Sequence, residues 1–167
     1  MKKILAGVAV VAVAAALAAP AVAGSSSAFD TIEGHYEAIR LALLHDGTGG
    51  VAAHAKAIVE EVAALEKRFD ADAARVAGEK AGECQSLLPQ IGKAAATLAG
   101  AADLAAARNA FFELSKPMVR YREMVSGQRP VVVYCPMAKR SWLQPEGTIG
   151  NPYLGQKMPT CGEIVSQ

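Results

Sequence analysis

Apolar residues recur at alternating spacings of three and four residues along four successive segments, 29–43, 51–69, 77–98 and 104–125. This spacing places the apolar side chains of each segment on one face of an α-helix. A β-strand needs a period of two, which none of the four segments has. The pattern therefore predicts four amphipathic helices that bury their apolar faces in one core.

Alanine gives these segments their apolar character. The chain is 52% hydrophobic but only 5% aromatic, and 21 of the 60 residues in 51–110 are Ala. Alanine is the strongest helix former, and its small side chain lets neighbouring helices approach closely. With short links between the segments, we expect a mainly α protein with a four-helix up-down bundle over 24–125.

Capping residues and prolines indicate where these helices begin and bend. Three acidic positions are expected to begin helices: Asp30 with Glu33 for the first, Asp70 or Asp72 for the third, and Asp103 for the fourth. Pro89 and Pro117 lie inside the third and fourth segments, where proline removes a backbone hydrogen bond. We expect a kink or a break at Pro89 and a kink at Pro117.

Residues 1–23 have the pattern of a secretory signal peptide. Lys2 and Lys3 precede an apolar run of 16 residues, and a stretch of small residues ends at Ala23. The run is shorter than the roughly 20 residues of a membrane-spanning helix. We therefore expect export to the periplasm, with the extracellular space as the alternative, and no membrane insertion after the signal is removed.

The charge balance and the missing motifs exclude several classes of function. With 17 basic and 16 acidic residues, the formal charge is +1, so no strong positive field attracts a nucleic-acid backbone. The chain has no Cys-x-x-Cys motif, no Gly-rich phosphate loop and no nucleophile elbow. We expect a protein that is not an enzyme.

The tail over 126–167 differs in character from the helical segments. A β-branched run at 131–133 predicts one short strand, with a hairpin as the alternative, followed by Gly- and Pro-rich loops. A segment of 42 residues rarely buries enough surface to fold alone. We expect the tail to pack on the bundle within a single domain over 24–167, with Trp142 and Tyr153 resting on Tyr121, Met124 and Val125.

Sulfur ligands gather in this tail. Cys135 and Met137 lie near its start, and Met158 and Cys161 near its end. Residues two apart in a strand point the same way, so Cys135 and Met137 would share a face. Thiolate and thioether donors select Cu(I), and by the same softness Ag(I). A turn that brings the two halves together would form a four-sulfur metal site.

A structural disulfide between Cys135 and Cys161, with both methionines packing, remains the alternative. It would close a 27-residue loop, for which the chain-entropy account gives about 3.5 kcal/mol. An oxidising compartment favours such a bond. The protein would then be a metal-free helical interaction or adaptor domain.

Other candidate ligands have simpler explanations. Cys84 lies on the apolar face of the third segment and is expected to be a buried, inert thiol. His35, His45 and His54 are spread over the first two segments and their link, without a helical i,i+4 pair. We expect packing or surface histidines, with an approach of one to the sulfur cluster as the alternative.

The tail also carries a recognisable combination of motifs. They are Tyr134-Cys135-Pro136-Met137-Ala138, Trp142-Leu143, and Ile149 with Asn151-Pro152-Tyr153, Gly155, Met158 and Cys161-Gly162. This combination resembles an uncharacterised domain found alone in exported bacterial proteins or at the C-terminus of periplasmic adaptor subunits of copper and silver RND efflux pumps. The resemblance implies heavy-metal handling in the periplasm, with the Cys and Met residues as ligands and an efflux-pump component or a metal donor or acceptor protein as partner.

Overall fold

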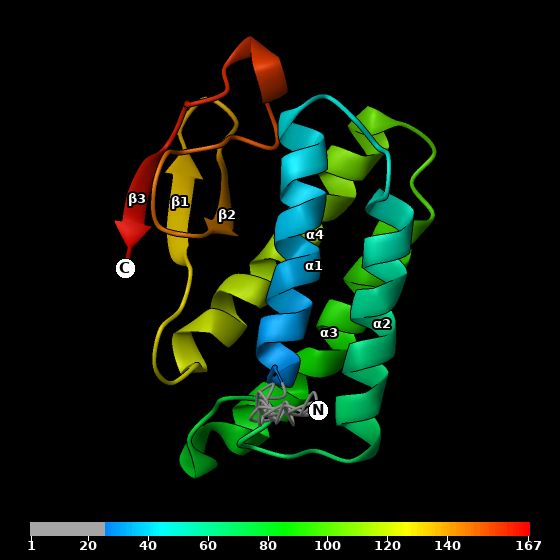
Figure 1. The fold of residues 1–167 in the computed structure, drawn as a ribbon, viewed down its shortest axis with the longest axis vertical. Helices are drawn as coiled ribbons and strands as arrows, with labels where there is room; N and C mark the ends of the chain where they lie inside the picture. The colour runs from blue at the N-terminus through cyan, green and yellow to red at the C-terminus, as the bar shows by residue number, and fades with distance from the viewer. Residues whose placement is uncertain (1–25) are drawn as a thin grey trace, which may run out of the picture.

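The computed structural model describes residues 26–167, so the signal peptide expected over 1–23 lies outside the described residues. The described chain is mainly helical, with a small antiparallel sheet at its C-terminal end (Figure 1). The helices are α1 (Ala28–Leu44), α2 (Val51–Lys67), α3 (Ala81–Ala99) and α4 (Leu104–Met124). The strands are β1 (Val131–Cys135), β2 (Arg140–Gln144) and β3 (Glu163–Ser166), and the short 3-10 helices are η1 (Gly78–Lys80) and η2 (Gly155–Lys157).

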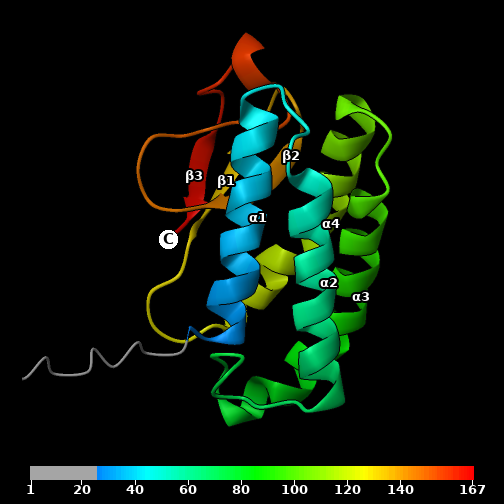
Figure 2. The same cartoon turned by 45° about the vertical axis from the view of Figure 1, so that its right-hand side comes forward.

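The predicted apolar faces form the core. Members of all four stripes are buried, among them Ile32, Ile58, Ile91 and Phe111. Each helix packs against the one that follows it in the chain (Figures 1 and 2). No helix within residues 26–167 is both long and apolar enough to cross a membrane.

Two of the expected helix starts are wrong. Ser27, not Asp30, caps α1, because the Ser27 hydroxyl accepts from the Asp30 backbone N–H at 3.1 Å. Asp70 accepts from two backbone N–H groups of the following turn, and α3 begins only at Ala81. Asp103 caps α4 as expected, accepting from the Ala106 N–H at 2.8 Å.

The two internal prolines end neither helix. The α3 helix continues through Pro89 and α4 through Pro117, so the break considered at Pro89 is wrong. Leu87, Leu88 and Ile91 around the first proline are all buried. Their packing offsets the hydrogen bond that a proline removes from a helix interior.

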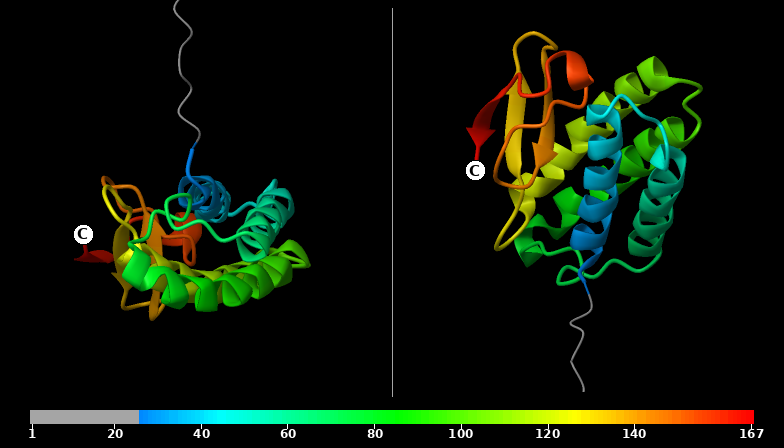
Figure 3. Two further views of the ribbon diagram at one scale, coloured as in Figure 1. Left: turned by 90° about the horizontal axis from the view of Figure 1, so that it is seen from below. Right: turned by 45° about the horizontal axis from the view of Figure 1, so that its top comes forward.

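The sheet has the strand order β2-β1-β3, with both neighbours antiparallel to β1. A four-residue turn over 136–139 joins β1 to β2, which confirms the hairpin alternative. The third strand was not expected. Seen from below, the sheet lies beside α1 and α4 and away from α2 (Figure 3).

The tail packs on a different part of α4 from the one expected. Tyr153 lies against Phe111 and Phe112 in the N-terminal half of α4, with ring centroids 6.0 and 6.1 Å away. Tyr121 instead contacts Phe29 of α1, at 5.0 Å between centroids. The reason is the direction of β1, which runs back along α4 and carries the rest of the tail toward the start of that helix (Figure 1).

Buried hydroxyl groups connect the sheet to the helices. The Leu143 N–H of β2 donates to the Tyr36 hydroxyl at 3.2 Å, and Tyr36 lies 2.6 Å from the Ser115 hydroxyl of α4. The Tyr153 hydroxyl lies 3.2 Å from Ser115 and donates to the Ser141 carbonyl at 2.7 Å. These contacts fix the sheet, and with it the sulfur-bearing loops, against α1 and α4.

Candidate functional site

Cys135 and Cys161 lie side by side, with their sulfur atoms 2.8 Å apart. The pairing of β1 with β3 brings them together. Tyr134 pairs with Glu163, so the next residues along the two antiparallel strands are Cys135 and Gly162, and Cys161 follows. Cys135 is fully buried, whereas Cys161 is partly exposed.

Asn151 organises the loop that carries Cys161. Its side-chain amide donates to the Cys161 carbonyl at 2.7 Å, and its side-chain oxygen accepts from the N–H groups of Tyr153 and Leu154. Its backbone N–H donates to the Pro159 carbonyl at 2.7 Å. Because Asn151 is fully buried, its hydrogen bonds hold the loop that carries the second thiol in place, in addition to the pairing of β3 with β1.

The two thiols have opposite protonation tendencies. Burial alone raises the pKa of Cys135, but hydrogen bonds from the Cys161 thiol, the Ala138 and Met137 backbone N–H groups and the Asn151 side chain lower it below the ordinary range. The hydrogen bond to Cys135 raises the pKa of Cys161. Cys135 is therefore the more acidic thiol of the pair, and Cys161 is the one that keeps its proton to higher pH.

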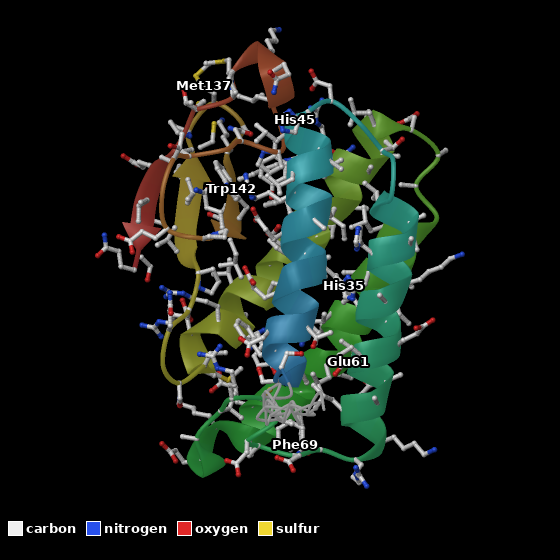
Figure 4. The ribbon with its side chains drawn as sticks, in the orientation of Figure 1. His35, His45, Glu61, Phe69, Met137 and Trp142 are labelled. Atoms are coloured by element: carbon white, nitrogen blue, oxygen red, sulfur yellow. The ribbon has the colours of Figure 1, made fainter. Side chains whose placement is uncertain are left out.

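The two candidate methionine ligands flank the thiol pair on the surface. Met137 lies in the turn after β1 and is 68% exposed, and Met158 follows η2 and is 38% exposed. Figure 4 shows Met137 at the same end of the molecule as η2. Because β1 ends at Cys135, the strand argument for a shared face is wrong for Met137. Coordination by either methionine remains a prediction.

Glycines permit the close packing under this site. Gly162 has φ +156°, and a Cβ there would lie 2.9 Å from both Trp142 and Val133. Gly155 has φ +54°, in the left-handed region, and lies against the ion pair of Asp46 and Arg108. Both glycines in the motif thus stand where a larger residue would displace the loops.

The remaining motif residues support the loops. Trp142 and Pro152 are buried, Tyr134 is half-buried and Pro136 is exposed in the β1–β2 turn. Arg108 of α4 donates to the Pro152 carbonyl at 2.8 Å. Trp142 packs edge-on to Tyr153, with centroids 5.8 Å apart, so the aromatic residues form a layer between the loops and the helices.

Cys84 differs in character from the two tail thiols. Its side chain is fully buried in α3, and burial raises its pKa to about 11. The thiol therefore stays protonated at neutral pH, as expected for a buried, inert cysteine.

Two histidines come together where none was expected to. His35 of α1 and His54 of α2 have their Nδ1 atoms 3.0 Å apart, whereas His45 is exposed on the link between these helices. Each of the paired histidines precedes a buried residue, Tyr36 or Ala55, so both border the face where α1 meets α2. The sequence has no signal that pairs the two rings, because their contact depends on the packing of α1 on α2.

Among residues 26–167, no group of three or more His, Cys, Asp or Glu side chains gathers closely enough to hold a metal ion. Comparison of the chain with protein-family models, curated proteins and solved structures gave no match. The thiol pair and its hydrogen bonds therefore carry the functional proposal.

Proposed function

We propose that this protein is a periplasmic soft-metal binding module that holds Cu(I), or Ag(I), at Cys135 and Cys161, with Met137 and Met158 as further ligands. The observation that carries the proposal is the contact of the two thiol sulfurs at 2.8 Å. The module would sequester the metal or pass it to an efflux-pump component or another metal-carrying protein. It has no enzymatic role in this proposal.

The state of the thiols supports a soft cation. Hydrogen bonds lower the pKa of Cys135 despite its burial, and a thiolate is the form that binds metal. Cu(I) favours thiolate and thioether sulfur over oxygen ligands. An ion between the sulfurs requires them to separate, and Cys161 is the thiol of the pair that is partly exposed.

The surface position of the methionines adds a second argument. An exposed thioether contributes little hydrophobic stabilisation. The Met137 side chain is 68% exposed and does not pack in the core. Both methionines stand in turns directly beside the thiol-bearing segments. Coordination gives these exposed side chains a role that packing does not.

The second candidate function is a metal-free adaptor domain with a Cys135–Cys161 disulfide. The short sulfur–sulfur distance of 2.8 Å favours it, because a disulfide bond needs only a further approach to about 2.05 Å. The two states exclude each other at any moment, since both thiols are consumed by the bond. Oxidation would release the metal.

The same proposal includes an up-down arrangement of the four helices. Packing of each helix on its successor in the chain supports it. The bundle would then serve as a rigid support to which the sheet and the sulfur loops are fixed through Tyr36 and Ser115.

A competition titration tests the metal site. Reduced protein is titrated with Cu(I) against a chromophoric Cu(I) chelator, and we expect it to withdraw one equivalent. Cys135→Ser and Cys161→Ser should each abolish competition, Met137→Leu and Met158→Leu should weaken it, and the matched control Cys84→Ala should leave it unchanged. Absence of competition, or competition unaffected by both serine variants, would refute the proposal.

Intact mass under non-reducing conditions separates the two candidates. The adaptor function predicts a mass lower by two hydrogen atoms, and it predicts that Cys84 is the one alkylatable thiol, accessible only after denaturation. The metal site predicts that freshly exported protein carries both tail thiols reduced or bound to metal. Protein that stays oxidised in the periplasm would favour the adaptor.

A further inference from the structure

The strongest unexplained cluster outside the thiol site is the contact of His35 with His54. Their Nδ1 atoms lie 3.0 Å apart, and their ring centroids are separated by 5.2 Å with the ring planes tilted by 42°. Both side chains are half-buried between α1 and α2, and Figure 4 shows His35 there. One ring donates from Nδ1 and the other accepts at Nδ1.

The orientation of His54 is set by the start of its own helix. Gly50, at the N-terminal end of α2, faces the Cδ2 and Nε2 atoms of the His54 ring, since a Cβ there would lie 3.5 and 3.7 Å from them. The opposite edge of the ring, which carries Nδ1, therefore faces α1. The rigid helices thus hold both Nδ1 atoms toward each other.

The separation of 3.0 Å is that of a hydrogen bond between the two rings, and it also lies within the span of two nitrogens bound to one metal ion. At a metal–nitrogen distance of about 2.0 to 2.1 Å, nitrogens 3.0 Å apart subtend roughly 95° at the ion. An angle near 90° is that of neighbouring ligands in a tetragonal Cu(II) or Ni(II) site. Each ring must turn about its Cβ–Cγ bond to aim its lone pair at the ion, and that torsion is broad in histidine.

We propose that His35 and His54 form a second metal site, a two-imidazole chelate for a borderline divalent ion with Cu(II) as the preferred one. Water fills the other positions, because within the described chain no third His, Cys, Asp or Glu joins the pair. In the metal-bound state each ring is neutral with its proton on Nε2, so that both Nδ1 lone pairs face the ion; a donor ring in the neutral Nδ1–H form reaches this state by moving its proton to Nε2 through solvent, without net proton release. Cu(II) binds most tightly because imidazole complexes follow the Irving–Williams order.

The histidine site differs from the thiol pair in its ligands, which are imidazole nitrogens instead of sulfurs, and in the oxidation state of the copper, which is Cu(II) instead of Cu(I). It is tested in tag-free protein carrying Cys135→Ser and Cys161→Ser, which removes the thiols that would bind copper or reduce Cu(II). Calorimetry with Cu(II) and with Zn(II) gives affinities, and electron spin echo modulation counts the imidazoles bound to Cu(II). Circular dichroism checks that every variant keeps its helices.

We expect one Cu(II) with modulation from two imidazoles and weaker binding of Zn(II). His35→Gln and His54→Gln should each weaken Cu(II) binding by at least about tenfold, and the exposed control His45→Gln should leave it unchanged. No binding, modulation from one imidazole, or an affinity unaffected by both glutamine variants would overturn the proposal. A negative result for the histidine site would not count against the proposed Cu(I) site, because the Cu(I) titration depends on the cysteines.

Discussion

Replacing Asn151 by aspartate tests the residue on which the geometry of the thiol site depends. The two side chains have the same shape, and the oxygen that accepts from Tyr153 and Leu154 is kept. Only the donating half of the amide is lost. The new carboxylate oxygen then faces the Cys161 carbonyl, to which the amide donates at 2.7 Å, and the Cys135 sulfur.

The expected cost follows from burial. A buried acceptor that loses its donor costs about 1 to 3 kcal/mol, and a facing carboxylate adds repulsion to that loss. Because Asn151 is fully buried, we expect a loss near the upper end, about 3 kcal/mol at pH 7, which corresponds to a fall in Tm of about 10 °C for a chain of this size.

The stability difference between the Asn151→Asp variant and the unmodified protein should change with pH in a defined direction. When the introduced carboxyl is protonated, it can donate to the Cys161 carbonyl, so folding raises its pKa above the unfolded value of about 3.9. The variant therefore regains stability as the pH falls, and it loses this stability again as the pH rises through the pKa of the folded state. Urea unfolding of both proteins from pH 4 to pH 8 should show a gap that widens with pH. The control Asn109→Asp, which keeps its acceptor for Arg140 on the surface, should show none. A gap under about 0.5 kcal/mol at pH 7 would refute the role given to Asn151.

Three further outcomes are expected. Tyr36→Phe should lower the free energy of unfolding, measured with urea, by about 2 kcal/mol because the buried Leu143 N–H loses its acceptor. The control Tyr134→Phe should lower it little, and an equal loss in both variants would contradict this role of Tyr36. Gly162→Ala should lower Tm by several degrees, since its Cβ would lie 2.9 Å from Trp142; an unchanged Tm would show that the loop yields. Cys161→Ala should raise the pKa of Cys135, seen as thiolate absorbance appearing at higher pH, because the hydrogen bond from the Cys161 thiol that lowers this pKa is removed; an unchanged midpoint would assign the shift to the backbone.

Local patterns predicted what local forces determine. The four helices follow from apolar spacing within each segment, and Asp103 from a capping preference that involves only its own turn. The cap of α1 was misplaced because the helix begins at Ala28, before Asp30, and Ser27 accepts from the Asp30 N–H. Helix boundaries depend on such single hydrogen bonds, which the apolar spacing does not encode.

Non-local pairing was beyond the sequence. The β3 strand has four residues, with Ile164 and Val165 exposed, so it carries neither the length nor the buried face that marks a strand. Its pairing with β1 is nonetheless what places Cys161 beside Cys135. The four candidate sulfur residues could be named from their chemistry, but the contact of two of them depends on an edge strand with no signal of its own. The same holds for His35 and His54, which meet only because α1 packs on α2.

The weakness of β3 gives the sulfur site a structural consequence. β3 pairs with β1 over few residues, with an irregularity between Val132 and Val133, and its side chains bury little surface. An ion or a disulfide between Cys135 and Cys161 ties the loop before β3 to the end of β1, and so stabilises the pairing from one end. A ligand that binds only the folded state adds RT ln(1 + [L]/Kd) to stability. The gain in local stability on metal binding should therefore be largest in β3. Amide exchange of β3 should therefore slow on Cu(I) binding while that of α2 and α3 stays constant, because those helices pack away from the sheet.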